Sequence, residues 1–79
     1  MKKRRDPILT LLGKRIREMR QERGLSQEHL ALEAELDRSY VGGVERGERN
    51  LTFRSLCQIA HALKVDLSSL TAGLLQQKQ

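Results

Sequence analysis

The segment Asp37–Asn50, DRSYVGGVERGERN, decides how this chain is expected to fold, because a helical pattern in it is interrupted by two adjacent glycines. Its apolar residues, among them Val41 and Val44, are spaced as on the buried side of a short helix. Gly42 and Gly43 stand in the middle of that helix, where each costs about 1 kcal/mol relative to alanine. A small protein that keeps both glycines needs them for something other than helix stability.

A second helix is expected immediately before this segment, and the connection between the two helices is short. Ala31 and Ala34 belong to the inner face of that earlier helix, and only residues 35–37 separate Ala34 from Arg38. Two helices joined in this way form a helix-turn-helix, whose second helix enters the major groove of DNA by its N-terminal end. The sequence therefore predicts a nucleic-acid-binding motif in the middle of the chain.

Three further short helices are predicted around this pair. Pro7 suits the first position of the first helix, and Gly24 suits its left-handed end. The residues expected to cap the five helix starts are Asp6, Ser26, Asp37, Thr52 and Asp66. No alternating strand pattern appears, so the predicted fold class is all-α, a compact five-helix domain. The expected organisation is a basic arm at 1–6, the helix-turn-helix domain at 7–75 and a frayed tail at 76–79, with fraying expected to begin near Leu74.

Composition limits the class of protein. The chain has 79 residues, enough for one domain, and a net charge of +5. A single cysteine excludes an internal disulfide, and no apolar run reaches the length of a membrane span or a signal peptide. We therefore expect a soluble cytoplasmic protein. Residues 1–24 hold nine of the 15 Lys and Arg residues, and this local charge suits an anionic partner or serves solubility alone.

Residues 11–72 resemble the Cro/lambda-repressor type of helix-turn-helix domain, the Xre family. The residues that carry the resemblance are RGLSQEHLA (23–31), LDRSYVGGVERG (36–47), IAHALKV (59–65) and DLSSL (66–70). Within the family, LDRSYVGGVERGERNLT (36–52) looks most like the controller proteins of restriction–modification systems. The resemblance implies a lambda-repressor-like fold and a homodimer on palindromic double-stranded DNA. The family usually has glycine where this chain has Glu35, so either Glu35 is left-handed or the turn differs.

The expected third helix would present one face to the bases. With Arg38 at its N-terminal end, positions 38, 39, 42 and 43 lie on one side. Gly42 and Gly43 would then let the backbone approach the bases closely, while Arg38 pairs with guanine O6 and N7. In the other interpretation, Gly43 is small only to fit a neighbouring helix. The expected base contacts are Arg38, Ser39, Tyr40, Gly42 and Gly43.

Phosphate contacts are expected on either side of that helix. The free N–H groups at the start of the second helix favour an anion, and the family resemblance implies that Gln27 binds a phosphate there and braces the third helix. Residues after the third helix would position the protein without reading sequence, unless they form a solvated loop. The expected phosphate contacts are Gln27, Arg46, Arg49, Asn50 and Thr52. The basic arm, residues 2–5, would contact DNA or be a solvated tail.

Two structural roles complete the expected site. By resemblance, Glu45 pairs with Arg20 of the first helix, the alternative being two separate surface charges. Four leucines exceed what so small a core can hide, so we expect part of this set to pair with a second copy across a two-fold axis, the alternative being that they complete the monomer core. This set is Leu51, Leu67, Leu70 and Leu74. Such dimers place their recognition helices about 34 Å apart.

Other kinds of site are not supported by the sequence. Cys57 and His61 lie one helical turn apart, and only His29 could add to them, so no metal site is expected. No catalytic constellation or phosphate-binding glycine loop appears, and we expect no cofactor, small-molecule ligand or enzyme activity. The expected function is a dimeric, sequence-specific and autoregulatory transcriptional regulator. The alternatives are a phage-type repressor, or a protein-interaction module of the same fold, such as an antitoxin, without specific DNA binding.

Overall fold

The structure, a computed structural model, describes residues 5–76 and consists of helices joined by short connections. The helices are α1 (Pro7–Glu22), α2 (Gln27–Ala34), α3 (Arg38–Glu45), α4 (Phe53–Leu63) and α5 (Leu67–Thr71), followed by a short 3₁₀ helix, η1 (Leu74–Gln76). Residues 5–76 contain no β-strand, which confirms the predicted all-α, five-helix class. Within the same range, every helix is too short or too polar to cross a membrane.

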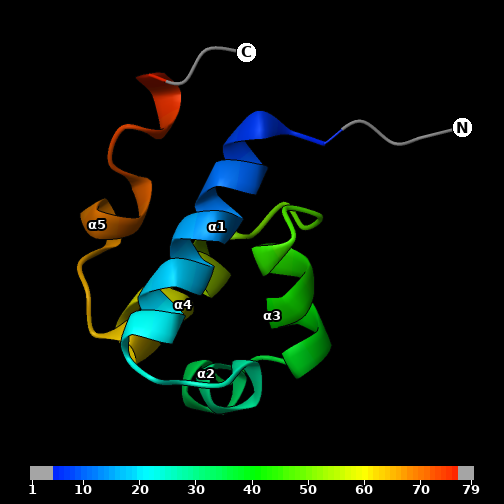
Figure 1. Cartoon of the computed structure of the whole chain (residues 1–79), viewed down its shortest axis with the longest axis vertical. Helices are drawn as coiled ribbons and strands as arrows, with labels where there is room; N and C mark the ends of the chain where they lie inside the picture. The colour runs from blue at the N-terminus through cyan, green and yellow to red at the C-terminus, as the bar shows by residue number, and fades with distance from the viewer. Residues whose placement is uncertain (1–4, 77–79) are drawn as a thin grey trace, which may run out of the picture.

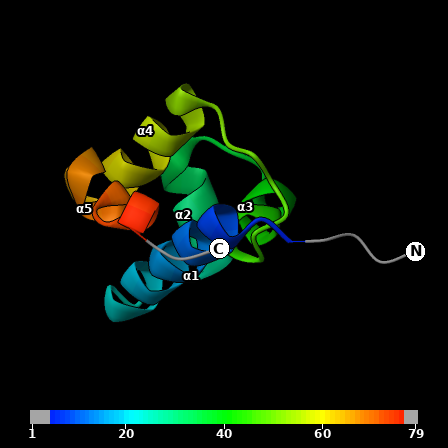
Figure 2. The ribbon, with the colours of Figure 1, turned by 90° about the horizontal axis from the view of Figure 1, so that it is seen from above.

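The helices pack around one aliphatic core. α1 lies in the centre, with α3 on one side and α5 and η1 on the other (Figure 1). α2 packs against both α3 and α4, and the view in Figure 2 shows α4 and α5 beside each other. The fully buried side chains come from all five α-helices, and they are Ile16, Leu30, Val41, Val44, Ile59, Leu63 and Leu70. This core fixes α3 between α1 and α2.

The helix starts follow the predicted capping residues at three of five positions. Side-chain oxygens of Asp6, Ser26 and Thr52 each accept a hydrogen bond from a backbone N–H of the first turn, at 2.9–3.0 Å. Asp37 and Asp66 occupy the capping position, but neither side chain makes the capping hydrogen bond within residues 5–76. The prediction of a side-chain cap was wrong there. Both aspartates are exposed, so solvent can satisfy their carboxylates and the N–H groups beside them.

Two helices end in a left-handed residue that is not glycine. Glu35 has φ 60° and ψ 44°, and Leu36 N–H donates to the Ala31 carbonyl at 2.9 Å. Lys64 ends α4 with nearly the same angles. Of the two alternatives for the helix-turn-helix turn, the left-handed backbone is therefore the one found, at a cost of about 1–2 kcal/mol. Gly24 and Gly47 are left-handed at φ 69° and 78°, and for Gly24 this is the conformation expected after α1.

The C-terminal segment is folded against the rest of the molecule as far as Gln76. Leu70 is 0% and Leu74 is 7% exposed within the single chain, so these two leucines complete the monomer core instead of an interface. Arg15 of α1 holds this segment in place, because its Nη1 donates to the carbonyls of Leu70 at 2.9 Å and Ala72 at 2.7 Å. Leu74–Gln76, where fraying was expected to begin, form η1, while residues 77–79 of the predicted tail lie outside the described residues.

α1 and α3 meet backbone to backbone at Gly13, a contact that the sequence analysis did not identify. A Cβ atom at Gly13 would lie 2.3 Å from the carbonyl oxygen of Val44 and 2.8 Å from that of Glu45. Real Cβ atoms essentially never come so close to another heavy atom. Gly13 therefore sets the distance between α1 and the C-terminal end of α3.

We expect Gly13→Ala to lower the free energy of unfolding by about 2 kcal/mol. Separating α1 from α3 costs about 3 kcal/mol as overpacking, and the better helix propensity of alanine returns about 1 kcal/mol. Urea unfolding followed by circular dichroism measures the difference. Gly42→Ala is the matched control, since its Cβ would meet only the ends of side chains, Arg46 Nη1 at 3.2 Å and Gln27 Oε1 at 3.6 Å, and no backbone atom. A Gly13→Ala protein as stable as this control would contradict the contact.

Candidate nucleic-acid interface

The sequence of α3 divides the helix between core and solvent. Val41 and Val44 are buried, whereas Arg38 and Ser39 are exposed at the N-terminal end of the helix. Tyr40 is half-buried and packs against the core. This arrangement presents the N-terminal end of α3 outward, as a helix that enters a major groove must be presented.

The two glycines of α3 are covered by long polar side chains from other parts of the chain. A Cβ at Gly42 would lie 3.2 Å from Arg46 Nη1 and 3.6 Å from Gln27 Oε1. The nearest atoms to a Cβ at Gly43 all belong to the Arg49 side chain, beginning at 3.0 Å with its Cγ. The space beside Gly43 therefore holds an arginine and not the neighbouring helix of the alternative interpretation. Close approach of both glycines to bases stays a prediction.

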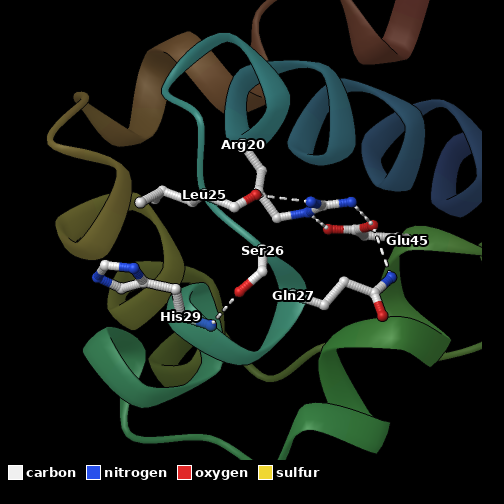
Figure 3. A network of polar contacts seen from close by, with 6 residues as sticks. All are labelled: Arg20, Leu25, Ser26, Gln27, His29 and Glu45. Carbon is white, nitrogen blue, oxygen red and sulfur yellow. Dashed lines mark hydrogen bonds and ion pairs between the residues drawn. The ribbon is translucent and has the colours of Figure 1, made fainter.

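A buried ion pair fixes α3 to α1. Arg20 Nε lies 2.7 Å from Glu45 Oε2, and Arg20 Nη2 donates to Glu45 Oε1 at 3.0 Å (Figure 3). Arg20 is 9% and Glu45 is 8% exposed. Arg20 Nη1 also donates to the Leu25 carbonyl at 2.8 Å. The structure thus shows the predicted pair as a bidentate, buried contact, and it excludes the alternative of two separate surface charges.

Gln27 joins this network from the first residue of α2. Its Nε2 donates to Glu45 Oε1 at 2.9 Å, as Figure 3 shows. The brace that the sequence predicted between α2 and α3 is therefore present. Among the described residues, no buried side-chain nitrogen or oxygen lacks a hydrogen-bond partner, so the network is complete. A phosphate contact by Gln27 stays a prediction.

The loop after α3 adds exposed polar side chains beside the helix. Arg46, Arg49, Asn50 and Thr52 are all exposed, and Arg46 Nε lies 3.1 Å from Glu48 Oε1. Thr52 has a structural role as well, because its Oγ1 accepts the Ser55 N–H and caps α4. We call Arg38, Ser39, Arg46, Arg49 and Asn50 the α3 surface. Its three arginines make it a cationic face of the molecule.

One residue of the expected basic arm lies at the same loop. Arg5 Nη2 is 3.4 Å from Glu48 Oε2, and Arg5 Nη1 donates to the Arg46 carbonyl. Lys2, Lys3 and Arg4, the rest of the arm, lie outside the described residues. Both arginines at Glu48 are more than half exposed, so these pairs add little to stability.

Several residues that shape the interface gave little signal in the sequence. Gln58 Nε2 donates to the Ala34 carbonyl at 2.7 Å and ties the end of α2 to α4. Glu48 and Gly13 also escaped prediction. Only Gly13 carried a usable signal, since a glycine inside an amphipathic helix indicates a close contact. Glu48 and Gln58 are ordinary polar residues whose partners depend on the fold.

Comparison with known proteins places this geometry in a family. A helix-turn-helix family model matches residues 16–70. Control protein C.BamHI of Bacillus amyloliquefaciens is 36% identical over 77 residues, which covers 91% of this chain and 95% of that protein. The restriction–modification controller protein C.AhdI from Aeromonas hydrophila has a crystal structure with 50% identity and a TM-score of 0.78, covering 78% of this chain and 94% of that one.

A complex with DNA has been solved for a further relative. It is a tetramer of the restriction–modification controller protein C.Esp1396I on its natural 35-base-pair operator, with 37% identity, a TM-score of 0.80, and coverage of 90% of this chain and 93% of that one. The Xre-type resemblance drawn from the sequence is thus confirmed. The chain belongs to the helix-turn-helix family and, within it, to the controller proteins of restriction–modification systems.

Proposed function

We propose that this chain is a sequence-specific DNA-binding transcriptional regulator that acts as a homodimer on palindromic operator DNA and regulates its own gene. The observation that carries the proposal is the buried Arg20–Glu45–Gln27 network, which fixes α3 with Arg38 and Ser39 exposed at its N-terminal end. A rigid helix presented in this way loses little conformational freedom when it docks into a groove. The DNA complex of C.Esp1396I supports the same use of the fold.

In the proposed complex, the residues of the site divide between positioning and readout. Arg38 pairs with guanine in the major groove, with Ser39 and Tyr40 beside it. The first turn of α2 offers backbone N–H groups to a phosphate next to Gln27. The remaining expected phosphate contacts are Arg46, Arg49, Asn50 and Thr52. Phosphate contacts set the register of α3 on the duplex, and base contacts then select the sequence.

The proposed dimer interface consists of apolar side chains that the monomer core does not fully bury. Leu51 and Leu67 are half-buried in the single chain, so they can still bury surface against a second copy. Phe53 and Leu75 are exposed apolar side chains, at 71% and 87%, and they would add to the same kind of contact. A two-fold axis would then match the symmetry of a palindromic operator.

The proposal places this regulator in the cytoplasm and assigns it no enzyme activity. Its one cysteine, Cys57, leaves no internal disulfide to maintain, which suits a reducing compartment. The relatives that cover most of the chain include control and controller proteins. Transcription would then depend on the concentration of the protein, because the concentration sets how much dimer forms and how much operator is occupied.

The experiment that tests the function is a binding titration at several salt concentrations. It uses purified protein, a duplex from immediately upstream of its own gene, and a random duplex of equal length as control. We expect binding to the upstream duplex at least about a thousandfold tighter than to the control. Equal binding that is lost steeply with salt would show only non-specific attraction to phosphates and would contradict the proposal.

A further inference from the structure

The side chain of Arg49 lies flat on α3 although Arg49 belongs to the following loop. Glu48 N–H donates to the Gly43 carbonyl at 2.9 Å, which folds the loop back over the end of the helix. The Cγ, Nε and Cδ atoms of Arg49 then lie 3.0, 3.3 and 3.7 Å from the position of a Cβ at Gly43. The guanidinium carbon of Arg49 ends 5.5 Å from the centroid of the Tyr40 ring.

We propose that Gly43 is a positioning residue for Arg49. Its missing side chain leaves the space through which Arg49 reaches from the loop to Tyr40, so that the guanidinium lies beside the half of α3 nearest Arg38. The inference rests on the proposed function and extends it, because one charge of the α3 surface is supplied from outside the helix. Gly43 would therefore affect DNA binding without contacting a base.

The two glycines differ in what an added methyl group would displace. At Gly42 the closest atom is the far end of a flexible side chain, Arg46 Nη1 at 3.2 Å. At Gly43 the closest atom is Arg49 Cγ at 3.0 Å, with Nε at 3.3 Å, so the added methyl group presses on the stem of the arginine and not only on its end. We therefore expect Gly43→Ala, unlike Gly42→Ala, to remove Arg49 from Tyr40.

Contact with Tyr40 would matter because an exposed arginine is otherwise free to move. An arginine held against an aromatic ring gains a cation–π interaction, and less side-chain freedom is then lost on binding DNA. Tyr40 is itself held by the core, so the guanidinium is aimed by a fixed surface. Loss of this contact should weaken DNA binding even though every charge of the protein is retained.

The free protein gives the first test, by NMR of the Arg49 side chain. The chain has one tyrosine, one phenylalanine and no tryptophan, so few rings other than that of Tyr40 can produce ring-current shifts at Arg49. We expect shifted Arg49 δ and ε protons in the wild type and in Gly42→Ala, and a return toward unperturbed values in Gly43→Ala. Unchanged shifts in Gly43→Ala would overturn the proposal.

DNA binding gives the second test, as a double-mutant cycle on the duplex from upstream of the gene. We expect Gly43→Ala to weaken binding about tenfold, the scale of one hydrogen bond to a charged group, and to raise Tm by several degrees. In an Arg49→Ala background, the same change should have no further effect on binding. An equal loss in both backgrounds would mean that Gly43 itself approaches the DNA, and would overturn the proposal.

The two tests separate this inference from the proposed function. If the wild type fails to prefer the upstream duplex, the proposed function fails, and the NMR comparison still decides whether Gly43 positions Arg49. If the wild type binds specifically and the Arg49 shifts do not depend on Gly43, only the inference fails.

Discussion

Arg20→Ala is expected to lower the free energy of unfolding by about 3–5 kcal/mol, the usual cost of removing one partner from a buried ion pair. The Glu45 carboxylate would keep only the Gln27 amide as a partner, and the Leu25 carbonyl would lose the Arg20 donor. A protein of this length has a total stability of about 4–12 kcal/mol. The variant should therefore be largely unfolded at a urea concentration that leaves the wild type folded.

A second variant separates the net contribution of the ion pair to stability from the cost of leaving one charge buried without its partner. Arg20→Met combined with Glu45→Leu removes both charges, and it should recover most of the lost stability, because apolar side chains often replace buried ion pairs without loss. Arg17→Ala, an exposed site on the same helix, should change stability by less than about 0.5 kcal/mol. If Arg20→Ala were no worse than this control, the pair would not hold α3.

The fold was largely predictable because the local signals agree with one another. Ser26 and Thr52 cap their helices as their side chains suggest, and Gly24 has the positive φ expected after α1. The Arg20–Glu45 pair was predicted only through family resemblance, since sequence spacing alone does not show which charges meet. The family, and with it the expected function, could therefore be predicted from several different motifs whose spacing matches that family.

The features that could not be predicted from the sequence depend on contacts between residues that are distant in the chain. Hydrophobicity alone did not separate Leu70, which completes the monomer core, from Leu67, which stays half-buried. Asp37 has the right type for a cap, but its exposed side chain makes no capping hydrogen bond. The covering of Gly43 by Arg49 follows from how the loop folds back, and no local pattern specifies that path.

Arg38→Ala is expected to remove most of the preference for operator DNA while leaving the fold intact. Arg38 is exposed at the first position of α3, so its loss creates no cavity in the core. A bidentate arginine–guanine contact is worth about 1–3 kcal/mol, and a dimer would lose it at two half-sites. The ratio of upstream to random binding should therefore fall by about a hundredfold, measured by titration at one fixed salt concentration.

The comparison with Arg46→Ala shows whether Arg38 reads bases. Loss of a phosphate contact weakens both duplexes alike and lowers the salt dependence by about one unit of slope. Arg46→Ala should behave in that way, whereas Arg38→Ala should leave binding to the random duplex nearly unchanged. Equal weakening of both duplexes by Arg38→Ala would make Arg38 a phosphate contact, and base readout would then depend on Ser39, Tyr40 and the shape of the operator.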